Sequence, residues 1–271
     1  MIVDGKAIAE KLYGELAKER EAFGDLILGH LLTEVSTVTA SYARIKERGA
    51  ARLGIKMFRT ELPPGSTTAD ALDAIKHLVE TTDGVIPQLP IVKGIDIESV
   101  LNAIPKEKDV DVLSAAAIAE FEKGGWPAIP PVPAALAYIL KESDIDVRGK
   151  NLVMLGKGRL VGKPGSILFT RLGANVTCLV KGDEVESSTR AADIIVLGTG
   201  VAGILKPDMV KDGVAVVDAG TSEQGGKVVG DADPAVAEKA SVFTPVPGGV
   251  GPVAIAMIYK NLFALKKTFR T

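Results

Sequence analysis

Apolar and polar residues follow two periods along the chain, and these predict helices and strands in turn. Ile8, Leu12 and Leu16 recur every four residues within 5–22, which is the spacing of one helix face. Residues 25–32 form a short apolar run typical of a buried strand. The two patterns then alternate, and they predict a helix at 37–53, a strand at 55–60, a helix at 70–80 and a strand at 84–86. Such alternation predicts an α/β layer fold with a parallel sheet.

A second series of strands and helices begins after residue 150. Strands are predicted at 151–155, 175–180, 193–197 and 214–218, and a helix that ends near residue 172 follows the first of them. This βαβ series is typical of nucleotide-binding domains. Segments 124–133 and 245–251 are rich in Pro and Gly and should be irregular, and helices at 134–141 and 253–267 should follow them.

Two α/β lobes are therefore expected. The first is an N-terminal lobe over residues 1–113, to which the last helix, 253–271, returns. The second is a Rossmann-type lobe over residues 114–252. A length of 271 residues allows two domains of ordinary size.

Composition narrows the range of functions. Aromatic residues make up 4% of the chain while 46% is hydrophobic, so the core should be mostly aliphatic, as in buried parallel sheets. The net charge is −2, whereas a nucleic-acid-binding protein is expected to carry an excess of basic residues. Nucleic acid is therefore not expected to be the main partner. One cysteine and two histidines form no metal-binding pattern. Without a membrane-length apolar run or a signal-peptide pattern, the chain is expected to be cytoplasmic.

A glycine-containing turn follows the predicted strand at 151–155. Gly156 and Gly158 fit the start of a dinucleotide-binding fingerprint, whereas Gly162 comes one residue late. Glycines let the backbone approach a pyrophosphate closely, but a purely structural turn explains the spacing equally well. Lys181 follows the next strand, where NAD-binding proteins usually carry an acidic residue. Together with Lys157, this cation favours NADP over NAD.

Candidate acid/base chemistry lies in the first half of the chain. Tyr42 and Lys46 are four positions apart on a predicted helix and share one face. Lys46 could transfer protons if its pKa were lowered, although a solvated lysine beside a packing tyrosine is the commoner case. Gln88 follows a buried strand and could face a ligand or cap a turn. Asp111 could bind a pair of ring N–H groups or simply cap a helix.

Taken in order, these segments resemble the methylenetetrahydrofolate dehydrogenase/cyclohydrolase (FolD) family over most of the chain. The most specific element is the segment Pro245–Pro252, PVPGGVGP, which resembles the C-terminal signature of the family. Gly156–Pro164 resembles its nucleotide turn. Its substrate-side motifs are matched by Tyr42-x-x-x-Lys46, Gln88-Leu89-Pro90 and Asp109-Val110-Asp111.

The resemblance implies an activity and a set of roles. The chain would be an NADP-linked enzyme that oxidises 5,10-methylenetetrahydrofolate and hydrolyses the methenyl product to 10-formyltetrahydrofolate, and it would form a homodimer. Lys46 would be the central acid/base, Tyr42 would pack against the folate and Gln88 would keep Lys46 neutral. Substrate binding would also involve Leu89, Asp111, Pro247, Gly248, Gly249, Val250 and Gly251, the last five in a cleft between the lobes. NADP would be held by Gly156, Lys157, Gly158 and Lys181, with Thr221 on the nicotinamide side.

The sequence departs from the family pattern at several positions. Val112 stands where a glycine usually follows Asp-Val-Asp, and Lys157-Gly158 replaces an Arg-Ser pair. After Pro252, Val253-Ala254 replaces the usual Met-Thr. These departures leave open a folate- or nucleotide-binding homologue that has lost catalysis. A two-lobed NAD(P)-dependent dehydrogenase of another small metabolite, such as a shikimate dehydrogenase, is a further alternative.

Overall fold

The computed structural model describes residues 1–34 and 37–269, which divide into two compact units. Unit 1 comprises Met1–Leu12 and Val132–Ala254, and unit 2 comprises Tyr13–Pro131 and Ile255–Thr271. Helices α1 (Gly5–Arg20) and α9 (Val250–Thr268) contribute residues to both units. The lobe limits predicted above, 1–113 with 253–271 and 114–252, remain a proposal for how the chain divides.

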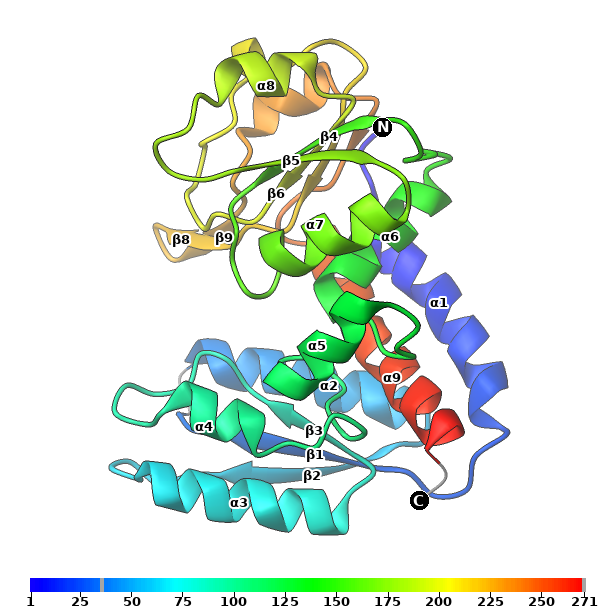
Figure 1. The fold of residues 1–271 in the computed structure, drawn as a ribbon, viewed down its shortest axis with the longest axis vertical. Coiled ribbons are helices and arrows are strands. Elements are labelled where there is room, and N and C mark those ends of the chain that lie inside the picture. The colour runs from blue at the N-terminus through cyan, green and yellow to red at the C-terminus, as the bar shows by residue number, and fades with distance from the viewer. Residues whose placement is uncertain (35–36, 270–271) are drawn as a thin grey trace. The chain divides into compact units, whose positions relative to one another are not determined.

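Unit 2 is built on a three-stranded parallel sheet in the order β2-β1-β3 (Figure 1). The strands are β1 (Ile27–Leu32), β2 (Lys56–Glu61) and β3 (Gly84–Pro87). The helices between them are α2 (Thr37–Arg52) and α3 (Thr68–Thr81). These elements confirm the predictions for this region. Helices α4 (Ile97–Asn102) and α5 (Ala115–Lys123) were not predicted, and their N-caps are Asp96 and Ser114.

The two faces of this sheet differ in chemistry. On one face, Leu31 and Val85 pack with Ile75 and Leu78 of α3 in an apolar cluster. Because side chains alternate along a strand, His30 projects to the opposite face, where Ile86 of β3 is its register partner. The alternation therefore places His30 and its register partner on β2, Arg59, on the face away from the apolar cluster, which we call the polar face.

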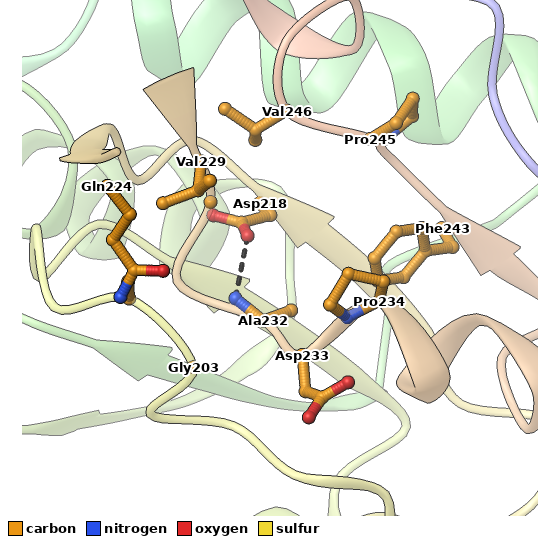
Figure 2. A pocket seen from close by; sticks show the side chains of 12 residues that line it. Gly203, Asp218, Gln224, Val229, Ala232, Asp233, Pro234, Phe243, Pro245 and Val246 are labelled. Carbon is orange, nitrogen blue, oxygen red and sulfur yellow. Dashed lines mark hydrogen bonds between the residues drawn. The ribbon is translucent and has the colours of Figure 1, made fainter. Parts of the chain in front are cut away.

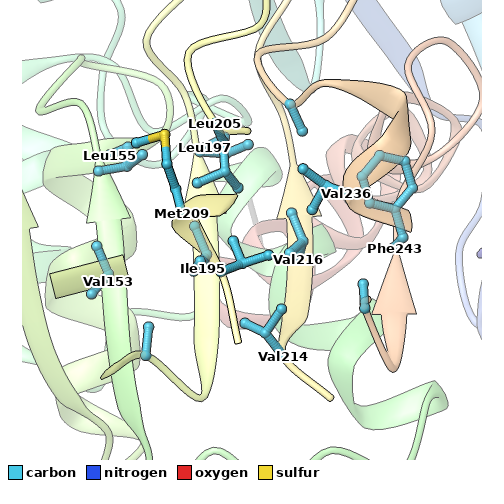
Figure 3. Close-up of a cluster of buried hydrophobic side chains, with 14 residues drawn as sticks. Val153, Leu155, Ile195, Leu197, Leu205, Met209, Val214, Val216, Val236 and Phe243 are labelled. Atoms are coloured by element: carbon cyan, nitrogen blue, oxygen red, sulfur yellow. The ribbon is translucent and has the colours of Figure 1, made fainter. Parts of the chain in front are cut away.

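Unit 1 contains a five-stranded parallel sheet in the order β10-β7-β6-β4-β5. Its strands are β4 (Asn151–Leu155), β5 (Asn175–Leu179), β6 (Ile194–Leu197), β7 (Ala215–Asp218) and β10 (Val242–Phe243). Four of the five confirm predicted strands. Aliphatic side chains form its core, among them Val153, Ile195, Leu197 and Val216 (Figure 3). The sheet therefore confirms the aliphatic core expected from the composition.

Helices and shorter elements complete unit 1. The helices are α6 (Pro131–Glu142), α7 (Gly162–Arg171) and α8 (Glu186–Ala191), with 3₁₀ turns at Pro207–Met209 and Pro234–Glu238. Strands β8 (Ser222–Gln224) and β9 (Lys227–Val229) pair as an antiparallel hairpin.

Both segments predicted to be irregular are shorter than expected. Helix α6 begins at Pro131, inside 124–133, and α9 begins at Val250, inside 245–251. The first N–H groups of a helix have no partner within the helix. A proline there therefore costs no intrahelical hydrogen bond. The prediction was therefore wrong at 131–133 and at 250–251, where breaker residues open helices instead of interrupting them.

Strand order marks one end of the unit 1 sheet as a binding edge. From β4 the chain passes to β5 on one side, and then to β6, β7 and β10 on the other. Ligands of open α/β sheets bind beyond the carboxyl ends of the strands at such a change of direction. The turn that begins at Gly156 directly follows β4 at this edge. No helix among the described residues is long and apolar enough to cross a membrane.

Candidate active site

Lys46 and Gln88, which are 42 positions apart, are joined by a hydrogen bond in unit 2. The Lys46 Nζ donates to Gln88 Oε1 at 3.0 Å. Gln88 lies just beyond β3, and its backbone N–H donates to the Leu31 carbonyl at 2.8 Å, which continues the sheet pairing. Burial lowers the pKa of Lys46, while the nearby Asp111 carboxylate opposes that shift. The pair combines an amine of reduced basicity with a neutral acceptor.

The Gln88 amide has a fixed orientation. Its Nε2 donates to the Leu89 carbonyl at 2.7 Å, which turns Oε1 toward Lys46. The same oxygen lies 3.3 Å from Nε2 of His30, whose side chain is fully buried. The sequence reading gave His30 no role, although the period of two along β1 places it on the polar face. Burial and the Lys46 and Arg59 charges lower the pKa of His30 to about 3, while its bond to Gln88 opposes them.

Asp109 and Asp111 have different surroundings. Asp109 is fully buried, pairs beside Val85 of β3, and accepts the backbone N–H groups of Leu113 and Ser114 at 2.9 and 2.7 Å. It therefore anchors the start of α5. Burial raises the pKa of Asp111 to about 6, with the Lys46 charge opposing. Of the two, Asp111 is the carboxylate whose charge acts on Lys46. Its expected role in binding the pterin edge stays a prediction.

Val112 has a backbone conformation that suits glycine. Its φ is +55°, in the left-handed region, which disfavours β-branched residues. This conformation explains why a glycine fits the family pattern at this position. The chain keeps the turn after Asp111 despite the valine.

Replacing Val112 with Gly should cost less stability than replacing its neighbour Val110 with Gly. Both side chains are buried, so each change removes similar apolar contacts. Only Val112→Gly also relieves a left-handed backbone, a gain of about 1–2 kcal/mol. Urea unfolding of the two variants measures the difference, and equal losses would contradict the strain assigned to Val112.

Tyr42 lies one helical turn before Lys46 on α2 and is 38% exposed. It therefore presents an aromatic surface to solvent, as a residue that packs against a ligand must. Tyr259 of α9 contacts the backbone of α2, because its hydroxyl donates a hydrogen bond to the Lys46 carbonyl at 2.5 Å. Lys46 thus sits on a helix that is fixed by α9.

The turn after β4 forms a close-packed backbone cradle in unit 1. Gly156 has φ +97°, and a Cβ there would lie 2.7 Å from the Gly198 carbonyl oxygen. A Cβ on Gly162 would lie 2.0 Å from the Gly156 carbonyl oxygen. At Gly158 the nearest atom is 3.9 Å away, so only this glycine has room for a side chain. Two of the three glycines are therefore required by the turn itself.

Three further predicted residues follow strands of the same sheet at their carboxyl ends. Lys157 comes two residues after the end of β4, and Lys181 two residues after the end of β5. The backbone N–H of Gly156 donates to the Leu179 carbonyl at 2.9 Å, so the two lysines leave adjacent points of the edge. Thr221 follows β7, between Asp218 and β8.

Two buried carboxylates that the sequence reading missed organise the loops at this edge. Asp231 accepts the backbone N–H and hydroxyl of Thr199, at 2.6 and 2.8 Å. Asp218 accepts the backbone N–H groups of Gly220 and Ala232, both at 2.8 Å. Burial raises the pKa of Asp218 to about 6. No local motif marks these residues, because Thr199 and Ala232 lie 32 and 14 positions away from the carboxylates that they contact.

Asp218 also lines a cavity of about 370 Å³ in unit 1. Figure 2 shows its carboxylate bonded to Ala232, with Val229, Phe243 and Val246 around it. Within the described part of the chain, no group of three or more His, Cys, Asp or Glu side chains could hold a metal ion.

The segment Pro247–Gly251 belongs to unit 1, whereas Tyr42, Lys46 and Gln88 belong to unit 2. Gly248 has φ +104°. A Cβ on Gly249 would lie 2.6 Å from the Pro245 carbonyl oxygen. The backbone conformation at Gly248 and the tight packing at Gly249 therefore already require two of its glycines. Its expected role in substrate binding stays a prediction.

Models of one enzyme family match both halves of the chain. The catalytic domain of tetrahydrofolate dehydrogenase/cyclohydrolase matches residues 3–111, and its NAD(P)-binding domain matches residues 130–270. This chain belongs to the tetrahydrofolate dehydrogenase/cyclohydrolase family. The resemblance seen in the motifs is thereby confirmed.

Full-length relatives agree with this assignment. The bifunctional protein FolD of Methanoculleus marisnigri is 37% identical over 98% of this chain and 96% of its own length. The crystal structure of FolD from Campylobacter jejuni has a TM-score of 0.93 and 31% identity, and covers 99% of both chains. A Trypanosoma brucei FolD, complexed with an NADP cofactor and an inhibitor, has a TM-score of 0.93 and 30% identity, and covers 100% of this chain and 99% of its own.

The unit 1 turn suits the dinucleotide that the family model implies. Gly156 and Gly162 keep the backbone free of side chains where a Cβ would strike a carbonyl oxygen. Helix α7 begins directly after the turn, and the positive end of its dipole lies at its first residues, among them Lys163. With Lys157 and Lys181 at the same edge, the residues present fit a phosphorylated nucleotide.

Proposed function

We propose that this chain is a bifunctional enzyme, an NADP-dependent 5,10-methylenetetrahydrofolate dehydrogenase and 5,10-methenyltetrahydrofolate cyclohydrolase. The observation that carries the proposal is the Lys46–Gln88 hydrogen bond in a chain that matches the family in both halves. The bond pairs an amine of lowered pKa with an oxygen that only accepts. A lysine with a lowered pKa is a candidate general base, because more of it is present as the neutral amine.

The dehydrogenase step removes hydride from the one-carbon bridge of the folate. When bound, NADP⁺ supplies the acceptor for that hydride. The protein binds and orients both molecules. Gly156 and Gly158 allow close backbone approach to the pyrophosphate, and Lys157 and Lys181 pair with the 2′-phosphate. Thr221 is assigned to the nicotinamide side by the family resemblance.

The cyclohydrolase step adds water to the methenyl carbon and opens the ring to give 10-formyltetrahydrofolate. Neutral Lys46 takes a proton from the attacking water and returns it to the ring nitrogen that leaves the carbon. The second proton of the water is released to solvent as the formyl C=O forms. A permanently charged ammonium could not act as this base and would repel the cationic substrate. Gln88 orients Lys46 through its acceptor oxygen.

The remaining roles concern folate binding. Tyr42 packs against the folate ring system, and the Asp111 carboxylate accepts two N–H groups of the pterin edge. Leu89 and the segment Pro247–Gly251 complete the substrate contacts in this proposal.

Folate binding should weaken below pH 6. Only the ionised Asp111 carboxylate accepts both pterin N–H groups, and the pKa of this group is about 6. KM for the folate should therefore be constant above pH 7 and rise by up to tenfold per pH unit below about 6. Steady-state kinetics measure the profile. Asp111→Asn should raise KM at every pH and remove the rise, and an unchanged profile in this variant would contradict the role.

Lys181→Ala should weaken the binding of NADP⁺ without weakening the binding of NAD⁺. Only NADP⁺ carries the 2′-phosphate, and a hydrogen bond to a charged group is worth about 1.5–3 kcal/mol, or at least tenfold in binding. KM for each nucleotide, measured with wild type and variant, tests this. Equal losses for both nucleotides would place Lys181 elsewhere on the cofactor.

The overall activity is tested with the purified chain and each substrate in turn. NADP⁺ should be reduced only when methylenetetrahydrofolate is supplied, and methenyltetrahydrofolate should be hydrolysed faster than in buffer. Tight folate binding without turnover would instead select a non-catalytic homologue. A homodimeric assembly is also proposed, on the family resemblance alone. The cytoplasmic location expected in the sequence analysis likewise stays a proposal.

A further inference from the structure

His30 is a buried histidine beside the catalytic pair, outside the motifs that carry the family resemblance. Its side chain is fully buried on β1, and its Nε2 lies 3.3 Å from Gln88 Oε1. Lys46 donates to that same oxygen at 3.0 Å. One amide oxygen therefore connects the proposed acid/base to a second titratable side chain.

The contacts determine which nitrogen of His30 carries the proton. Burial and the cationic neighbours Lys46 and Arg59 keep the ring neutral at pH 7. A neutral imidazole has one N–H, and an amide oxygen can only accept. The proton therefore lies on Nε2, which donates to Gln88. Nδ1 is left as a buried lone pair, without a hydrogen-bond partner among the described residues.

Three contacts hold the Gln88 amide in one orientation, and one of them comes from Lys46. Its Nε2 already donates to the Leu89 carbonyl, and His30 supplies a second donor to Oε1. A turned amide would point its NH₂ group at two donors and lose all three bonds. His30 thus adds a further bond that favours the orientation in which Gln88 accepts from Lys46.

The charged groups around His30 come from three elements. Lys46 lies on α2, Arg59 on β2, and Asp111 acts on Lys46 from the segment beside β3. Arg59 is itself paired with Glu47 and Glu61. Lys46 is thus the charge most directly coupled to the oxygen that His30 contacts.

We propose that His30 is a positioning residue that fixes the Gln88 amide and, through it, the orientation and proton affinity of Lys46. The role rests on the proposed cyclohydrolase function. By donating to Oε1, His30 draws electron density from the oxygen that would otherwise stabilise the Lys46 ammonium. It therefore favours the neutral amine that can accept a proton from water.

Three variants test this proposal. His30→Leu removes the donor at similar volume, His30→Gln restores an N–H donor, and His77→Leu is the matched control. His77 lies on α3 and packs edge-on against Phe58, with 5.7 Å between the ring centroids, away from the proposed site. Each variant is assayed for methenyltetrahydrofolate hydrolysis across pH. In addition, the pKa of Lys46 is measured by NMR of ¹³C-labelled lysine in the protein without substrate.

His30→Leu should raise the measured pKa of Lys46 by about one unit, as expected for one neutral hydrogen bond. Its kcat should fall about tenfold at neutral pH with KM within about twofold, and the acid limb of the profile should move upward. His30→Gln should recover most of both effects, and His77→Leu should match wild type. Nitrogen NMR of wild type should show the Nε2–H tautomer.

An unchanged Lys46 pKa in His30→Leu would overturn the proposal, as would an Nδ1–H tautomer. A His30→Gln variant as impaired as His30→Leu would also overturn it, because packing alone would then explain both losses. If wild type hydrolyses no methenyltetrahydrofolate, the proposed function fails. The pKa and tautomer measurements then still decide whether His30 acts on Lys46.

Discussion

Replacing Lys46 with Met should reduce methenyltetrahydrofolate hydrolysis by about 10²–10⁴-fold, the usual contribution of a positioned acid/base. Methionine has a similar length but no proton to exchange. Lys46→Arg should be equally inactive, because a guanidinium stays protonated and cannot act as a base. That second variant separates proton transfer from a simple need for positive charge.

Two controls accompany the Lys46 variants: the hydrolysis rate of a variant at an exposed lysine, and the NADP⁺ affinity of Lys46→Met. Lys76→Met changes an exposed lysine on α3 and should leave hydrolysis at the wild-type rate. Binding of NADP⁺ should be unchanged in Lys46→Met, because the nucleotide turn lies in unit 1. Full hydrolysis by Lys46→Met, or substantial activity in Lys46→Arg, would contradict the role assigned to this amine.

Replacing Gly162 with Ala should damage both the stability of unit 1 and its nucleotide binding. The added Cβ would lie 2.0 Å from the Gly156 carbonyl oxygen and 2.7 Å from the Lys157 Cα, both backbone atoms. Relief requires the whole turn to move, at a cost of about 1–3 kcal/mol or more. Because the turn approaches the pyrophosphate, NADP⁺ affinity should fall by more than tenfold.

Gly158→Ala is the matched control for the stability of the same turn. Its Cβ would meet its nearest neighbour at 3.9 Å, an ordinary contact. Its unfolding free energy should stay within about 1 kcal/mol of wild type. Urea unfolding and calorimetric titration with NADP⁺ measure the two quantities. Equal stability of the two variants would show that the close contact at Gly162 does not constrain the turn.

Periodic patterns predicted the elements that are long enough to show a period. Helix α2 and strand β4 both lie where their apolar residues placed them. Strand β10 has two residues, too few for any alternation. Pro131 was interpreted as a breaker, but a proline at the start of a helix loses no intrahelical bond. Local patterns therefore predict periodic elements better than they predict the positions of helix ends.

The candidate site shows the same division between local and distant information. Tyr42 and Lys46 could be paired from their spacing alone. Gln88 could be placed near them only through the family motifs, because its neighbour lies 42 positions away in the chain. His30 was missed because one strand residue carries no motif, although its alternation with Leu31 marked the face it occupies. Tertiary contacts, rather than residue type, assign it to the site.

The most direct test of the account measures both products of one reaction. Purified protein is given NADP⁺ and methylenetetrahydrofolate, and NADPH and 10-formyltetrahydrofolate are quantified together over time. The two products should accumulate in equal amounts, and Lys46→Met should uncouple them by leaving methenyltetrahydrofolate to build up. Production of neither, or of 10-formyltetrahydrofolate at the same rate with Lys46→Met as with wild type, would contradict the proposed bifunctional activity.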